Sequence, residues 1–368
     1  MKSVLRFFRR EAVFTISLAA ALLSFLLAAP GRHTLEGIDT TTLLMLFTLM
    51  TVVAGLRRCG VFDLMGRAVA RRIRTRRGLA AALTAVCFFL AMIATNDVAL
   101  ITLVPFTLLL MAGGRERDVI VTVVLETLAA NLGSMVTPIG NPQNLYLYSS
   151  GLLTLADFPR LTWPYALMSL TLLMAAARLV SAEPLTAASG EDASIRGPWG
   201  LYAVLGAAAL LAVAKVLPAW AAAAIVLAGT LLLDRGVLRQ VDYALLGTFV
   251  CFFVFVSSVK ACEPVREWLE GLMAASPLLV SLLASQVISN VPACLLLSPF
   301  TESTGALMLG VNLGGLGTLV ASLASLISFK LYSASVTARK GQYFMVFTLA
   351  NLLGLAVLLA LAALLGQL

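Results

Sequence analysis

Four polar breaks interrupt long apolar runs of the chain, and they carry residue types that bind small ions. The breaks begin at Thr95, Asn131, Ser289 and Asn312. In the second break, two glycines and two prolines cannot continue a helix without freeing backbone amides and carbonyls, and such groups need a partner at membrane depth. Amides at a helix N-terminus suit an anion and carbonyls at a C-terminus suit a cation, so we predict an ion-binding site. Its candidate residues are Thr95, Asn96, Asp97, Asn131, Gly133, Ser134, Thr137, Pro138, Gly140, Asn141, Ser289, Asn290, Val291, Asn312, Gly314, Gly315, Gly317, Thr318 and Ser322.

Several candidates have a structural alternative to ligand contact. Thr137-Pro138 and Asn290-Val291-Pro292 each place a capping residue shortly before a proline, which is typical of the start of a half-helix. The asparagines and serines could therefore cap helices rather than contact a ligand. The glycines are expected to act through their backbone; they are Gly133, Gly314, Gly315 and Gly317.

Two carboxylates lie inside apolar runs, where an ionisable group is costly and tends to be functional. Asp97 could ligate a cation, carry a proton or cap the second half of its hairpin. Glu126, five residues before the second break, could relay a proton or pair with a polar neighbour. Both are candidates for binding a proton or a cation, and no residue is predicted to be catalytic.

The elements that position these residues are membrane helices. The chain has 368 residues, of which 60% are hydrophobic and 12% are charged. A soluble domain carries about 25% charged residues, and a soluble fold of this length could not cover so apolar a chain with polar surface. At ~20 residues per membrane helix, the length fits on the order of ten segments. We therefore predict an all-α polytopic membrane protein.

The remaining totals argue against several other classes. The net charge is +8, but the basic residues form short clusters between apolar runs, as expected at the cytoplasmic side of a membrane rather than for nucleic-acid binding. The five cysteines form no C-x-x-C pair, and His33 is the only histidine, which leaves no zinc or haem motif. There is no Walker A sequence for ATP. No cofactor is expected beyond a sodium ion or a proton as the coupling ion. The absence of these motifs also argues against an enzyme.

The apolar runs and basic clusters predict the order of the elements. In the first half we expect helices at 11–29 and 39–56, a basic amphipathic helix at 60–77, a re-entrant hairpin at 78–112, a broken helix at 118–150 and a helix at 162–180. In the second half we expect helices at 219–233 and 241–259, an amphipathic stretch at 261–275, a hairpin at 277–300, a broken helix at 305–331 and a last span at 343–366.

Charge placement predicts the orientation. The basic segment at 2–10 and the apolar stretch after it could be a signal peptide, but ~19 apolar residues are long for one and favour a first membrane helix. The predicted order of elements leaves five of the 26 Lys and Arg residues outside. Because Lys and Arg are retained inside, we expect a multi-pass protein of the cell membrane with a cytoplasmic N-terminus and an outer C-terminus.

The two halves of the chain resemble each other. Asn131-Leu132-Gly133-Ser134 matches Asn312-Leu313-Gly314-Gly315 at a shift of 181 positions, and the same shift carries Thr137 onto Thr318, Asn141 onto Ser322 and Asn144 onto Ser325. Asn96 and Asn290 correspond at the hairpin tips. The first repeat covers 1–180 and the second covers 219–368, joined by a linker and linking helix at 181–218. Because the repeats start on opposite sides, they predict the inverted architecture of secondary transporters.

These stretches resemble a known family. Thr95-Asn96-Asp97-Val98-Ala99-Leu100, Thr137-Pro138-Ile139-Gly140-Asn141-Pro142, Ser289-Asn290-Val291-Pro292-Ala293 and Asn312-Leu313-Gly314-Gly315-Leu316-Gly317-Thr318 are similar to motifs of the citrate-transporter-like ion transporter superfamily. It includes divalent-anion/sodium symporters, arsenite permeases and certain sodium/proton antiporters. The resemblance implies a homodimer of the elevator type. The dicarboxylate/sodium branch carries Ser-Asn-Thr at both tips, so the tips of this chain look closer to the arsenite and antiporter branches.

The sequence thus predicts a secondary active transporter of a small anion, a carboxylate or an inorganic oxyanion, coupled to a sodium or proton gradient. The alternatives within transport are a sodium/proton antiporter, which would use Asp97 and Glu126, and an arsenite efflux permease. Outside this class stand a channel and a membrane-embedded enzyme. The expected partners are the lipid bilayer, the small anion and a second copy of the chain, without nucleic acid.

Overall fold

The computed structural model describes residues 11–26, 31–70, 73–185 and 195–368. The basic segment 1–10, residues 27–29 of the first predicted helix, residues 71–72 and residues 186–194 of the linker lie outside them. The described residues are helical, which confirms the prediction of an all-α chain, and their one extended pairing is a bridge between Thr75 and Pro184.

The helices of the first half alternate between long spans and short pieces. They are α2 (Ala12–Ser24), α3 (Arg32–Glu36), α4 (Thr40–Arg58), α5 (Val61–Ala70), α6 (Arg76–Ala94), α7 (Asn96–Leu110), α8 (Glu116–Ser134), η1 (Pro138–Gly140), α9 (Pro142–Ser149), α10 (Asp157–Ala176) and η2 (Ala177–Leu179).

The second half follows a similar order. Its helices are α11 (Trp199–Val213), α12 (Ala219–Leu233), η3 (Arg235–Gln240), α13 (Tyr243–Ala261), α14 (Glu263–Ala275), α15 (Pro277–Ile288), α16 (Asn290–Leu297), η4 (Ser298–Phe300), α17 (Thr304–Leu313), α18 (Leu323–Ser333) and α19 (Lys340–Leu364).

Few of these helices cross a bilayer unbroken. Within the described residues, four are long and apolar enough to do so: Thr34–Arg58, Arg76–Ala94, Tyr243–Ala261 and Lys340–Leu364. Six shorter apolar helices have 10–17 residues, and α14 and α15 meet at a bend of 118°. Polar breaks account for some of these short lengths: α7 and α16 begin at the tip asparagines, and α17 ends within the fourth break.

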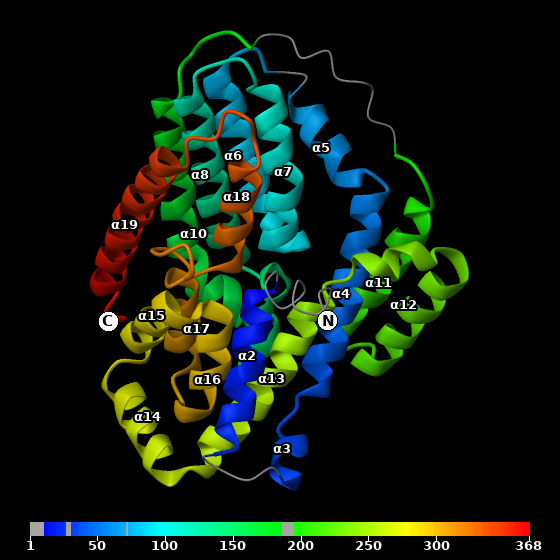
Figure 1. The fold of residues 1–368 in the computed structure, drawn as a ribbon, viewed down its shortest axis with the longest axis vertical. Coiled ribbons are helices and arrows are strands. Elements are labelled where there is room, and N and C mark those ends of the chain that lie inside the picture. The colour runs from blue at the N-terminus through cyan, green and yellow to red at the C-terminus, as the bar shows by residue number, and fades with distance from the viewer. Residues whose placement is uncertain (1–10, 27–30, 71–72, 186–194) are drawn as a thin grey trace.

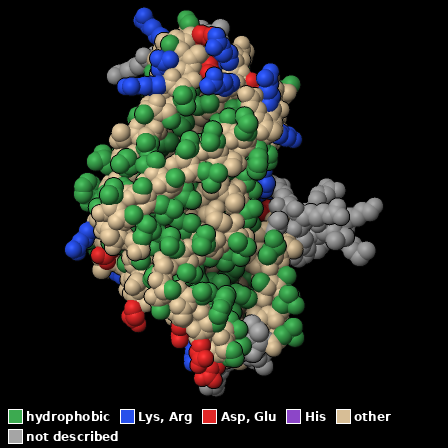
Figure 2. Space-filling model, turned by 90° about the vertical axis from the view of Figure 1, so that its left-hand side faces the viewer, with side chains coloured by type: hydrophobic (Ala, Val, Ile, Leu, Met, Phe, Trp, Pro, Cys, Tyr) green, Lys and Arg blue, Asp and Glu red, His purple; other side chains and the backbone are tan. Residues whose placement is uncertain are grey.

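The two hairpins occupy opposite ends of the molecule. Figure 1 shows α6, α7 and α8 in its upper half and α15, α16 and α17 in its lower half. Figure 2 shows one side of the molecule, where hydrophobic side chains cover the middle and Lys and Arg gather at the upper end. A wide apolar band with charge at its ends is the surface expected of a protein embedded in a bilayer.

The amphipathic helix predicted over 60–77 is shorter than expected. Helix α5 ends at Ala70, and α6 already begins at Arg76. Residues 73–75 continue neither helix, because the backbone there pairs with the segment after α10: Leu185 N donates to Arg74 O, and Arg76 N donates to Glu183 O, both at 3.0 Å. Arg76 is also buried beside Asp118, 3.8 Å away, and this polar cluster fixes the start of the hairpin.

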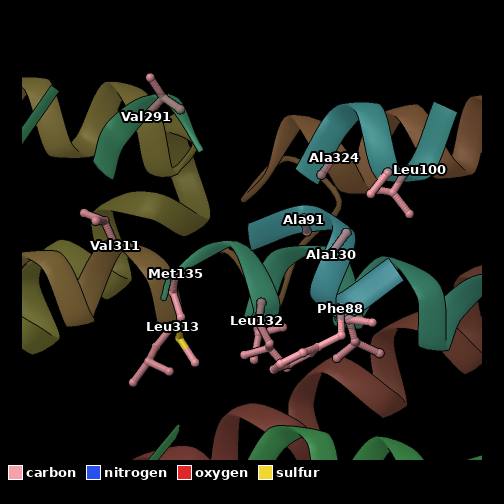
Figure 3. Packing of buried hydrophobic residues seen from close by; sticks show 14 of the residues in the cluster. Phe88, Ala91, Leu100, Ala130, Leu132, Met135, Val291, Val311, Leu313 and Ala324 are labelled. Carbon is pink, nitrogen blue, oxygen red and sulfur yellow. The ribbon is translucent and has the colours of Figure 1, made fainter. Parts of the chain in front are cut away.

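The core forms where the broken elements pack against one another. Helix α6 packs on α8, and α18 packs on α7. Figure 3 shows the second contact, with Ala324 beside Leu100. The first contact is so close that a Cβ at Gly133 would lie 2.1 Å from the carbonyl oxygen of Phe88. Such close packing needs a glycine there and leaves no room for water.

Candidate functional site

The two hairpin tips have the same backbone conformation. Thr95 has φ 72° and ψ 150°, and Ser289 has φ 75° and ψ 154°. Positive φ is uncommon for a residue with a side chain and marks a locally strained position. In the next residue the side-chain Oδ1 of Asn96 accepts from Asp97 N at 2.9 Å, and Asn290 Oδ1 accepts from Val291 N at 2.9 Å. Each tip asparagine, the first residue of the second arm, therefore satisfies one free backbone amide in the first turn of that arm.

The two broken segments exchange hydrogen bonds. Asn131 of α8 accepts from Ser322 Oγ at 2.9 Å and donates to Ser325 Oγ at 3.3 Å. Asn312 of α17 occupies the equivalent position in the second half. It accepts from Asn141 Nδ2 at 2.9 Å and donates to Asn144 Oδ1 at 2.8 Å.

These bonds pair equivalent positions. A shift of 181 carries Asn131 onto Asn312 and carries Asn141 and Asn144 onto Ser322 and Ser325. Each asparagine thus contacts the same two positions of the opposite half. All six side chains are buried. A buried polar cluster whose members are all paired rigidifies the contact that it spans.

Each broken segment is also tied to the hairpin of its own half. Thr137 Oγ1 donates to Met92 O at 2.5 Å, and Thr318 Oγ1 donates to Gln286 O at 3.1 Å. Both acceptors lie four residues before the tip asparagine of their hairpin. Asn290 N further donates to Ala321 O at 2.9 Å. The structure therefore brings the four predicted breaks into one region.

Small residues among the predicted site residues allow the broken segments to pack closely. Ser134 Oγ donates to Asn131 O at 2.9 Å and accepts from Asn141 Nδ2 at 3.1 Å. A Cβ at Gly140 would lie 2.1 Å from Ser134 O, so a side chain there would push the break open. Gly317 has φ 113°, a conformation that L side chains rarely adopt.

Two other glycines face the second hairpin. A Cβ at Gly314 would lie 2.8 Å from Ser285 Cβ, and one at Gly315 would lie 3.1 Å from the side-chain nitrogen of Asn290. These contacts place both glycines at the surface between the second break and its hairpin.

The predicted half-helix starts are displaced. Thr137 makes no capping bond, and Pro138 begins only the three-residue η1. The cap of α9 is Asn141, whose Oδ1 accepts from Asn144 N at 2.9 Å. In the other hairpin α16 begins at Asn290 itself, after Ser289. At Thr137-Pro138 the predicted helix start is confirmed only for the short η1, which has Thr137 in its N-cap position; the Thr137 hydroxyl donates to Met92 O of α6 instead of to a capping bond.

A cavity of about 150 Å³ opens beside the first tip. Among its lining residues are three of the predicted site residues: Thr95, Asp97 and Asn141. Asp97 Oδ1 is buried and has no hydrogen-bond partner among the described residues. Such an atom is costly to bury unless a ligand, ion, water or proton satisfies it.

The cavity also contains charged residues that the sequence did not suggest as ligands. Arg57, at the end of α4, and Asp242, before α13, both line it. The sequence indicates Arg57 only as part of a basic cluster at a helix end, and Asp242 only as a helix cap. Asp242 does cap α13, since its Oδ1 accepts from Leu245 N at 2.9 Å. No sequence pattern relates either residue to Asp97.

Glu126 lies apart from this cavity. Its side chain is fully buried, and its Oε1 accepts from Thr107 Oγ1 at 2.5 Å. Its Oε2 has no hydrogen-bond partner within the described part of the chain. The sequence leaves two roles open for Glu126, and the observed contact with Thr107 corresponds to the pairing with a polar neighbour.

Comparison with known proteins places these features in context. A family model described as "Citrate transporter" matches residues 4–306. The inner membrane protein YbiR of Escherichia coli is 34% identical over 84% of each chain. An uncharacterized transporter of Methanocaldococcus jannaschii is 28% identical over 88% of this chain and 90% of its own length. A silicon efflux transporter of Oryza sativa is 36% identical over 33% of this chain and 25% of its own length.

Proposed function

The chain belongs to the citrate transporter family, and we propose that it transports a small anion, a carboxylate or an inorganic oxyanion, driven by a sodium or proton gradient. It is a multi-pass membrane transporter and not an enzyme, as the sequence predicted. The substrate, the coupling ion and the mode of movement are the parts proposed here.

The observation that carries the proposal is the exchange of equivalent hydrogen bonds between the halves. Asn131 and Asn312 make the same pair of contacts in opposite directions. This pattern supports an inverted repeat, in which two similar halves enter the membrane from opposite sides. Such a pair of halves can expose one central site alternately to either side by a rigid-body movement.

The same bonds support an elevator movement. They tie α8 and α9 to α17 and α18, and the bonds of Thr137 and Thr318 tie each hairpin to its break. A body joined in this way would move as one unit against α4, α11, α12 and α13, in a homodimer. The basic end seen in Figure 2 supports placing that end of the molecule at the cytoplasmic face, because Lys and Arg are retained inside.

The cavity supplies groups for both an anion and a cation. The N-terminus of α9 at Asn141 and the guanidinium of Arg57 suit an anion. The unpartnered Oδ1 of Asp97 suits a sodium ion or a proton. A volume of about 150 Å³ accommodates several water molecules or a small carboxylate.

The test uses purified protein in proteoliposomes on a solid-supported membrane, with currents recorded after a jump in citrate or succinate. The jump is made with and without sodium at two pH values. We expect a saturable current that depends on one of these ions. Asp97→Asn should abolish the ion dependence, whereas Glu267→Gln, at an exposed carboxylate of α14, should behave like the wild type. Unchanged coupling in Asp97→Asn would remove this residue from the mechanism.

A second candidate is sodium/proton antiport, which is favoured by the two carboxylates, Asp97 and Asp242, in one cavity. It predicts a current evoked by sodium alone at high pH and no response to carboxylates. The rice relative is named for silicon efflux, so silicic acid and arsenite belong in the same screen. A response to either of these would assign the chain to inorganic efflux.

A further inference from the structure

A groove between α8, α10 and α19 lies apart from the cavity at the first hairpin tip. Its volume is about 370 Å³, and its walls are largely apolar, with Leu125, Leu128, Leu173 and Leu353 among them. We propose that this groove binds an anionic glycerophospholipid, with an acyl chain between the helices and the phosphate at Arg117. This proposal is independent of which substrate the protein moves.

One rim of the groove carries a free positive charge. Arg117, the second residue of α8, lines the groove and is exposed. No hydrogen bond or ion pair joins its side chain to another residue in the described ranges. It lies at the start of a helix that runs inward from the end where Lys and Arg gather (Figures 1 and 2). Basic pockets between membrane helices at such an end bind anionic headgroups.

The interior of the groove contains one unpaired polar group. Ser169 of α10 is 1% exposed, and its hydroxyl has no partner among the described residues. A buried hydroxyl without a hydrogen bond destabilises the fold, and an acceptor brought into the groove would satisfy it. The groove thus offers an apolar channel with a donor inside it and a cation at its rim.

The lipid would pack behind one of the broken segments. A Cβ at Gly354, which lines the groove, would lie 3.7 Å from Leu128 and 4.0 Å from Leu316 of the second break. On the same helix, Asn351 Oδ1 accepts from Gly317 N at 3.3 Å. A bound acyl chain would therefore support α19 where it holds that break in place, and should raise the thermal stability of the protein.

The test measures which lipids remain on the purified protein by native mass spectrometry. Phosphatidylglycerol and phosphatidylcholine with identical acyl chains are supplied in equal amounts. One arginine near an anionic lipid is worth about 1 kcal/mol, so we expect about fivefold preference for phosphatidylglycerol. Arg117→Gln should abolish the preference, and Gly354→Leu, which fills the groove, should lose both lipids. Arg239→Gln, an exposed arginine outside the groove, is the matched control.

Thermal unfolding in solution provides a second readout, which does not require the lipid to stay bound to the protein in the mass spectrometer. Phosphatidylglycerol should raise the Tm of the wild type and of Arg239→Gln, but not that of Gly354→Leu. An Arg117→Gln protein that keeps the wild-type preference would overturn the proposal. It would also fail if Gly354→Leu disrupted a dimer while lipid retention stayed unchanged, because the groove would then belong to a contact with a second copy.

Discussion

Replacing Asn312 by alanine tests the link between the two halves most directly. The variant loses the bonds to Asn141 and Asn144, which are worth about 0.6 kcal/mol each between membrane helices. It also strands Asn144 Oδ1, a fully buried acceptor for which the structure gives no other donor, at a cost of about 1 kcal/mol or more. We therefore expect Asn312→Ala to lower the free energy of unfolding by about 2–3 kcal/mol.

The assay is unfolding in mixed micelles with sodium dodecyl sulfate, followed by the fluorescence of the four tryptophans. The control is Thr230→Ala on α12, whose buried hydroxyl bonds only to carbonyls of its own helix. This control should lose about 1 kcal/mol through its missing methyl group. Because Asn144 is a direct partner, Asn312→Ala and Asn144→Ala should couple by about 1 kcal/mol, whereas Asn312→Ala and Thr230→Ala should be additive.

Two outcomes would refute this reasoning. One is an Asn312→Ala protein no less stable than Thr230→Ala, which would mean that the buried amides contribute nothing across the halves. The other is a coupling energy of zero between Asn312 and Asn144, which would mean that their contact at 2.8 Å is absent from the folded protein in micelles.

Two further predictions concern packing and pH. Gly133→Ala should cost about 1–3 kcal/mol in the same titration, because its Cβ would meet Phe88 O, while Gly341→Ala, with open space around it, should cost nothing. Hydrogen bonds from the hydroxyl and amide of Thr154 hold the pKa of Asp157, the first residue of α10, below its ordinary value. Their stabilisation is present above pH ~4 and lost as the pH falls through the folded pKa. The stability difference between wild type and Thr154→Ala should therefore shrink in acid, and a constant difference would contradict this.

The sequence by itself determined the class of the protein and the places where its helices break. Composition indicates whether a chain folds in water or in lipid, and 12% charged residues in a chain of 368 are too few to cover the surface of a soluble protein. Glycine and proline at 133–142 and 314–317 disrupt a helix through their own backbone chemistry, whatever surrounds them. The shift of 181 positions between the halves is likewise a property of residue order alone.

Only the tertiary structure decided which of these residues meet. The sequence predicted Asn131 and Asn312 as site residues, but it did not indicate that each would bond to the opposite half. Nor did it relate Arg57 and Asp242 to Asp97, since both have local explanations at helix ends. The physical reason is that periodicity and propensity are set by near neighbours, whereas contacts between residues more than a hundred positions apart depend on how whole helices pack.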